Sequence, residues 1–228
     1  MGEVIRSGEQ RGFRVWLALL GTPVVLACAF LPLGAYLAGA RGLRGDELSK
    51  AIEPLAVFPA SVGFAAAFLL TRALAKRDGL ALETLGWGRP TPVDVVIGVG
   101  AGGLLAAVNA WLLYPLVQVS QPSFDPTLAT MSLPAVAVTM VIAAVAEDTL
   151  YRGYALVVLK DRHGAVVAIA VTTTFYALLT PAQGVPLVLW AGYFGIVLTG
   201  LRLWRKSLWP VTLTHCVVAL SPKLLAQW

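Results

Sequence analysis

Long apolar stretches alternate with short polar segments along this chain. A helix needs about 20 mostly apolar residues to cross the hydrocarbon core of a bilayer. By that measure the pattern predicts seven spans, at residues 13–38, 52–74, 94–118, 132–159, 163–181, 184–203 and 207–226. We therefore expect an all-α protein, a polytopic membrane helical bundle of about seven transmembrane helices.

The composition supports an integral membrane protein with one folding unit. Hydrophobic residues make up 58% of the chain and charged residues 13%, and the mean hydropathy is +0.78. Soluble domains carry about twice that share of charge. The longest polar segments, 39–51 and 75–93, are too short to hold a core of their own. We expect residues 1–228 to form a single transmembrane domain.

The basic residues are distributed unevenly between the segments that connect the spans. Cytoplasmic segments of membrane proteins retain Lys and Arg, which predicts a cytoplasmic N-terminus and a C-terminus on the other side. The net charge of +5 is then explained by topology and by contact with anionic membrane lipids, and does not indicate nucleic-acid binding. The predicted cytoplasmic group is Arg6, Arg11, Arg14, Arg72, Lys76, Arg77, Arg89, Lys160, Arg162, Arg202, Arg205 and Lys206, against Arg41, Arg44, Lys50 and Lys223 opposite.

Two local patterns concern the third predicted span. The segment from Leu85 to Pro90 contains Trp, Arg and Pro, which is typical of a turn at the membrane interface. Within the span, Gly98 and Gly102 are four residues apart, which predicts a smooth face for close helix approach. The glycine run superficially resembles a dinucleotide-binding fingerprint, but no strand precedes it, so helix packing is favoured.

Three charges interrupt the fourth predicted span: Glu147, Asp148 and Arg152. A charged side chain inside a bilayer costs a few kcal/mol or more, so such residues usually face a bundle interior or a cavity. Asp148 and Arg152 are four residues apart and can pair along one helix face. Glu147 has no partner nearby in the sequence, which makes it a candidate acceptor for a proton from an attacking water.

The residues around these charges resemble a known family, the CAAX-protease and bacteriocin-processing membrane proteases, called CPBP or Abi. The segment from Glu147 to Arg152 is similar to its Glu-Glu-x-x-x-Arg motif. Phe175 begins a match to its Phe-x-x-x-His motif, and His215, after Leu-Trp-Pro, begins a match to its His-x-x-x-Asn motif. The order and spacing of the motifs agree over residues 132–220, the family-like core.

The resemblance implies an intramembrane endopeptidase, most often in a bacterial cytoplasmic membrane. It implies Glu147 as the general base for water, with Asp148 and Arg152 as its supporting pair. It places His215 where the family stabilises the oxyanion. In some accounts the family's Glu and His residues are metal ligands instead.

Two positions depart from the family motifs. Leu179 stands at the position of the second-motif His, and Ala219 at that of the third-motif Asn. Losing one oxyanion donor lowers turnover roughly 100- to 1000-fold, and losing a general acid or base adds a comparable factor. Tyr151, Tyr176, Thr180 and Gln183 are candidate substitute donors.

The remaining polar residues also bear on a metal cofactor. Catalytic zinc usually has three protein ligands rich in His. Only Glu147, Asp148 and His215 are left to supply them, so zinc is poorly supported and we expect no cofactor.

Three functions remain open. We favour a catalytically impaired or silent relative that binds a membrane peptide, a lipid or a partner protein, in which Glu147, Asp148 and Arg152 form a buried ion-pair network that fixes helix orientation. The alternative is an active intramembrane endopeptidase that cleaves a lipidated or membrane-associated peptide with water activated by Glu147. A proton-coupled transporter is a weaker third hypothesis, because intramembrane carboxylates can also carry protons.

Overall fold

The computed structural model describes residues 2–52, 55–113, 132–178 and 185–225. These parts of the chain are helical, with short turns and no strand among them. The elements are α1 (Gly2–Arg41), α2 (Gly45–Ile52), α3 (Val57–Arg77), α4 (Leu82–Leu85), α5 (Pro92–Val108), η2 (Asn109–Leu113), α7 (Leu133–Asp148), η4 (Thr149–Ala155), α8 (Leu156–His163), α9 (Ala165–Ala177), α10 (Val185–Arg205) and α11 (Trp209–Leu225).

Five helices in the described residues are long and apolar enough to cross a membrane: 10–41, 57–77, 92–112, 133–163 and 185–205. The fourth of these is continuous through α7, the π-helical segment η4 and α8. Shorter apolar helices at 165–177 and 209–221 correspond to the fifth and seventh predicted spans. The all-α membrane bundle expected from the sequence is confirmed, and the helices differ from the predicted spans mainly at their ends.

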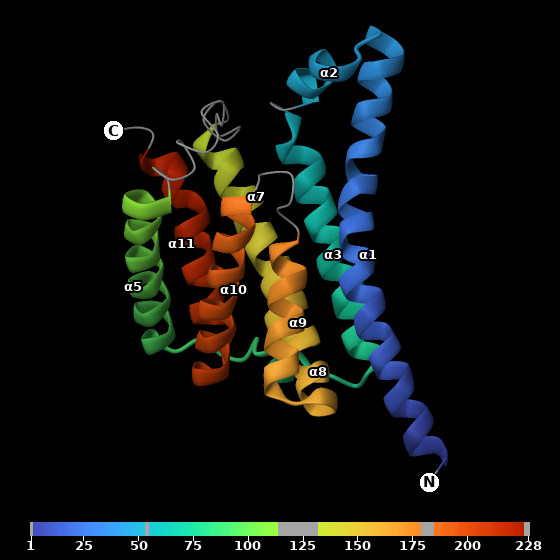
Figure 1. Ribbon diagram of the computed structural model, residues 1–228, viewed down its shortest axis with the longest axis vertical. Helices are drawn as coiled ribbons and strands as arrows, with labels where there is room; N and C mark the ends of the chain where they lie inside the picture. The colour runs from blue at the N-terminus through green and yellow to red at the C-terminus, as the bar shows by residue number, and fades with distance from the viewer. Residues whose placement is uncertain (1, 53–54, 114–131, 179–184, 226–228) are drawn as a thin grey trace.

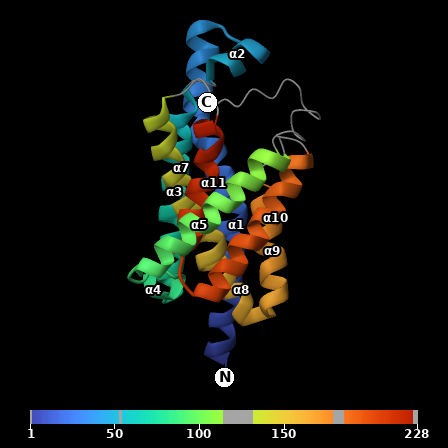
Figure 2. The same cartoon turned by 90° about the vertical axis from the view of Figure 1, so that its left-hand side faces the viewer.

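The helices stand roughly side by side, with α1 and α3 at one side of the bundle and α5 at the other (Figure 1). α3 packs against both α1 and α7, whereas α5 packs along α11. α10 contacts α9 and α11, and η4 contacts α1, α3 and α4 as well as α7, α8, α9 and α10. Seen from the side, α5 crosses in front of α11 (Figure 2). The segment from α7 through η4 is therefore the central element of the structure.

Glycine determines how closely α5 and α11 approach. A Cβ atom added at Gly98 would lie 2.7 Å from the Cβ of Leu213, and one at Gly102 would lie 2.7 Å from the Cβ of Val217. The Gly98 carbonyl also accepts a hydrogen bond from the Thr214 hydroxyl (3.0 Å). The predicted smooth face formed by these two glycines is confirmed.

Polar side chains tie the helix ends together near the N-terminal end of the bundle. Asp78, which follows α3 and is buried, forms an ion pair with Arg14 of α1 and accepts a hydrogen bond from the Tyr154 hydroxyl (2.7 Å). Asp94 of α5 pairs with Arg205 of α10 at 3.1 Å. Since these helices are far apart in the sequence, the pairs fix their relative height in the bundle.

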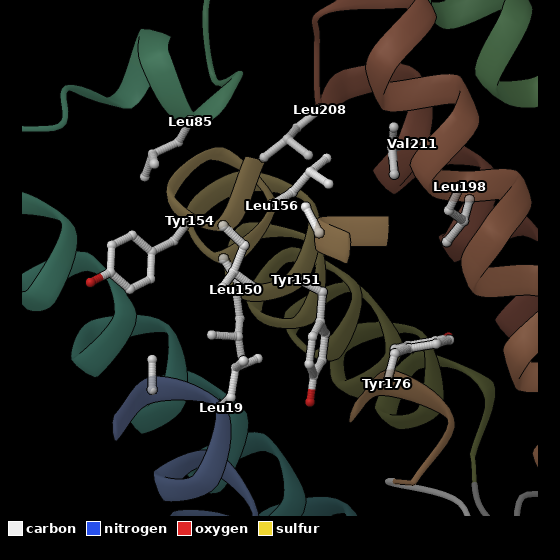
Figure 3. Close-up of a cluster of buried hydrophobic side chains, with 14 of the residues drawn as sticks. Leu19, Leu85, Leu150, Tyr151, Tyr154, Leu156, Tyr176, Leu198, Leu208 and Val211 are labelled. Atoms are coloured by element: carbon white, nitrogen blue, oxygen red, sulfur yellow. The ribbon is translucent and has the colours of Figure 1, made fainter. Parts of the chain in front are cut away.

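The apolar core surrounds η4. Leu150 of η4 lies beside Leu19 of α1, while Leu156 of α8 lies beside Leu208, the residue before α11 (Figure 3). Inside a bilayer, close van der Waals packing of such side chains is a main source of helix association. This core holds η4 in place and so positions Glu147, Asp148 and Arg152, which lie in or next to it in sequence.

Candidate functional site

The charged residues singled out in the sequence lie where α7 passes into η4, facing α11. Glu147 and Asp148 are the last residues of α7, and Arg152 lies in η4. His215 lies on α11, which packs against α7. The fold therefore brings together all four residues, although 63 positions separate Arg152 from His215 in the sequence.

Asp148 is the centre of the cluster. Its Oδ1 forms an ion pair with Arg152 Nη1 at 3.2 Å, with side-chain exposures of 0% and 1%. Its Oδ2 accepts a hydrogen bond from the Thr212 hydroxyl (3.0 Å). Both oxygens of a fully buried carboxylate are thus engaged, as burial of a charge requires. The pairing expected from the four-residue spacing is confirmed.

His215 lies between the two carboxylates. Its Nε2 is 3.6 Å from Glu147 Oε2, and its Nδ1 is 3.4 Å from Asp148 Oδ2, a contact without hydrogen-bond alignment. The side chains of His215 and Glu147 are 9% and 13% exposed, so the pair is mostly buried. Glu147, which has no nearby partner in the sequence, therefore obtains one from α11.

Aromatic rings enclose the cluster on the side of α9 and α10. The Tyr176 hydroxyl lies 3.4 Å from His215 Nε2. The Tyr176 ring lies under the Arg152 guanidinium, whose carbon is 4.0 Å from the ring centroid, a cation–π contact. Phe194 meets His215 edge to face at 5.3 Å. The Tyr151 ring meets the Tyr176 ring edge to face at 5.7 Å, and both are labelled in the close-up of the core (Figure 3).

The π-helical backbone of η4 is supported from outside the site. π-Helical turns are rare and occur frequently at functional sites. The Trp87 indole donates a hydrogen bond to the Thr149 hydroxyl (2.9 Å), which itself donates to the Val145 carbonyl (2.6 Å). Gly153 lets the turn after α4 approach, because an added Cβ would lie 3.2 Å from the Leu85 carbonyl oxygen. The segment 82–88 thus lies directly against η4.

Several donors in the site have no acceptor in the described part of the structure. They are Nε and Nη2 of Arg152 and the hydroxyl of Tyr151, all shielded from solvent. A buried donor without a partner costs about 1–3 kcal/mol. These groups are available to a carbonyl or carboxylate brought in by a ligand or to water.

The geometry does not favour a shared metal ion. Glu147 faces one ring nitrogen of His215 and Asp148 faces the other, so the two carboxylates lie on opposite sides of the imidazole. Asp148 is already engaged by Arg152 and Thr212. Among the described residues, no group of three or more His, Cys, Asp or Glu is arranged to hold a metal. The three donors do not converge on one point as a zinc site requires.

The structure describes some of the other residues named in the sequence analysis and not others. Phe175 and Tyr176 lie at the end of α9, and Ala219 lies one helical turn beyond His215. Leu179, Thr180 and Gln183 lie outside the described residues. Sequence reasoning missed Thr212 and Phe194. Thr212 is three residues before His215 and so shares its helix face, a signal that could have found it, whereas Phe194 offers none.

Fold and site together define a polytopic helical membrane protein with a buried glutamate–histidine cluster between two helices. Residues 129–221 match the family model described as "Type II CAAX prenyl endopeptidase Rce1-like". The resemblance to the CPBP family is confirmed for this segment, which contains the whole cluster. Searches of curated proteins and of solved structures found no match for the chain.

Proposed function

We propose that this protein is a catalytically impaired Rce1-like membrane protein that holds a membrane-anchored peptide at the Glu147–His215 pair without efficient hydrolysis. The family description names a prenyl endopeptidase, so a peptide carrying a lipid group is the ligand class that we propose. The membrane lipids around the bundle are its other partners. We place it in a bacterial cytoplasmic membrane with the N-terminus in the cytoplasm.

The observation that carries the proposal is that the polar side chains of the site already bind one another. Asp148 is bound by Arg152 and Thr212, and His215 is held between two carboxylates. The family's second-motif His and third-motif Asn are replaced by Leu179 and Ala219. An aliphatic side chain neither transfers a proton nor stabilises an oxyanion. The polar side chains that remain in the site therefore suit binding of a ligand better than hydrolysis.

One contact favours an active endopeptidase as the second candidate. The Tyr176 hydroxyl lies 3.4 Å from His215 Nε2 and could donate a proton or hydrogen bond where the family residues are missing. In that scheme Glu147 accepts a proton from a water molecule while the water oxygen forms a bond to the peptide carbonyl carbon. The proton passes to the leaving amine when the peptide bond breaks. No metal takes part in either candidate.

The test uses the purified protein reconstituted in lipid nanodiscs. Binding of fluorescent farnesylated and unmodified peptides is measured by anisotropy, and cleavage of the same peptides is followed by mass spectrometry. The variants are Glu147→Gln and the double change Leu179→His with Ala219→Asn, and each is checked for monodispersity and helix content before assay.

We expect wild type to bind the farnesylated peptide without cleaving it, Glu147→Gln to bind it comparably, and the double variant to gain cleavage. Cleavage by wild type that disappears in Glu147→Gln would establish the active alternative. If neither peptide binds to the intact protein, the proposed ligand class is wrong.

A further inference from the structure

Arg202, in the last turn of α10, is a buried basic residue outside the Glu147–His215 site. Its exposure is 8%. Arg152, the other buried arginine in the described residues, is paired with Asp148. Within the described part of the chain, no carboxylate forms an ion pair with Arg202. Burying a charge without a counter-charge is costly, so this residue requires an explanation.

The turn after α4 surrounds the guanidinium without supplying an anion. Nη2 of Arg202 donates one long hydrogen bond to the Thr84 carbonyl (3.4 Å), and its shielded Nε has no partner. Gly86 adopts φ +104°, and a Cβ atom there would lie 3.0 Å from the guanidinium carbon. The turn therefore leaves room for the guanidinium, and most of the hydrogen-bonding capacity of Arg202 remains available for an acceptor.

This end of the bundle has the character of a membrane interface. Trp87 and Trp209 meet edge to face at 5.2 Å, and the Trp209 indole donates to the Gly88 carbonyl (2.6 Å). Such rings favour the headgroup level of a bilayer. The charge of Arg205 is balanced by its ion pair with Asp94, while the Lys206 side chain is exposed. α4 and the lower end of α10 lie at the same end of the molecule (Figures 1 and 2).

We propose that Arg202 and the turn formed by residues 84–86 are a binding site for a phosphate group, supplied by the headgroup of an anionic membrane lipid. A guanidinium presents a planar fork of donors that matches phosphate oxygens. Basic pockets between transmembrane helices at the cytoplasmic side commonly take such headgroups.

A phosphate bound at Arg202 also acts on η4. The Leu85 carbonyl of the same turn lies against Gly153, next to Arg152. Holding α10 to the turn therefore stabilises the segment that carries the Arg152 ion pair. This inference is independent of the proposed function, because it involves neither Glu147 nor His215.

The experiment measures lipid retention and thermal unfolding of the full chain in a maltoside detergent, which contains no phosphate. Phosphatidylglycerol, phosphatidylcholine and inorganic phosphate are added separately. We expect native mass spectrometry to show one tightly retained phosphatidylglycerol, with a higher unfolding midpoint and weaker effects of phosphatidylcholine. If inorganic phosphate alone reproduces the shift, the phosphate site stands and the lipid source is wrong.

Variants assign the effect to Arg202. Arg202→Gln should weaken phosphatidylglycerol binding about tenfold, as expected for loss of a charge-assisted hydrogen bond, and Arg202→Lys should weaken it less. The matched control is Lys206→Gln, which removes an exposed charge at the same helix end and should leave binding nearly unchanged. The proposal is overturned if wild type retains no lipid preferentially, if Arg202→Gln binds like wild type, or if Lys206→Gln loses as much affinity. Should Arg202→Gln fail to fold, Arg202→Lys and the lipid comparison on wild type decide the question.

Discussion

At the scale of single residues, Asp148 is the side chain on which the buried cluster depends. It is the only carboxylate in the described residues that contacts Arg152, Thr212 and His215 together. Removing one partner of a buried ion pair leaves an uncompensated charge, which costs more than the pair itself contributes. Arg152, at 1% exposure, has no access to solvent that would compensate for the loss.

Asp148→Asn should therefore lower the free energy of unfolding by about 3–5 kcal/mol. The measurement is denaturant-induced unfolding in mixed micelles, with circular dichroism as the readout. Asp161→Asn is the matched control, because Asp161 is exposed at the end of α8, and its change should stay within about 0.5 kcal/mol. Equal stability of the two variants would show that the Asp148–Arg152 pair does not support the fold.

Thr212 supports the same carboxylate from α11. Thr212→Val keeps the shape of the side chain and removes the hydroxyl that donates to Asp148 Oδ2. We expect a loss of about 1–3 kcal/mol, because the acceptor is buried and charged. Thr214→Val, which removes the hydrogen bond to the neutral Gly98 carbonyl, should cost less. A larger loss for Thr214→Val would contradict this ranking.

At the scale of elements, the contact of α5 with α11 depends on which face carries glycine. Gly98 and Gly102 face α11, whereas a Cβ atom added at Gly100 or Gly103 would meet nothing within 4 Å. Since lipid tails are as apolar as side chains, close van der Waals packing is a main source of helix association in membranes. The position of α11, and with it of His215, depends on this contact.

Gly102→Leu should therefore destabilise the protein by about 1–3 kcal/mol through overpacking, while Gly103→Leu, one residue along on the open face, should be nearly neutral. Denaturant-induced unfolding in mixed micelles measures both. If the two variants lose equal stability, the cause is the helix backbone and not the α5–α11 contact.

At the scale of the whole molecule, the ion pairs place the basic helix ends on one side. Arg14 of α1, Asp78 after α3 and the pair of Asp94 with Arg205 connect the ends that lie near the N-terminus in Figure 1. Arg41 lies at the other end of α1. This arrangement agrees with the distribution of Lys and Arg, from which we predict a cytoplasmic N-terminus.

Cysteine labelling in intact cells tests this orientation. In a background with Cys28→Ser and Cys216→Ser, a membrane-impermeant maleimide should label Arg41→Cys from outside and should label Lys160→Cys only after permeabilisation. Both side chains are exposed, so accessibility within the protein is matched. The reverse labelling pattern would show that the N-terminus lies outside the cytoplasm.

The sequence by itself determined the class of protein and the chemistry-bearing residues. Runs of apolar residues are enough to predict membrane helices, because a bilayer requires every backbone polar group to be satisfied within the helix. Charges inside such a run identify Glu147, Asp148 and Arg152, and a four-residue spacing predicts the ion pair, because both are local properties of one helix.

Only the tertiary structure decided which side chains of different helices contact one another. The contacts of His215 and Thr212 join α11 to Glu147 and Asp148 at the end of α7. The contact of Tyr176 with Arg152 joins α9 to η4. The π-helical geometry of η4 depends on Trp87 and on the turn that packs against Gly153. No local pattern encodes these contacts, because they arise from the packing of segments that are 60 or more residues apart in some cases.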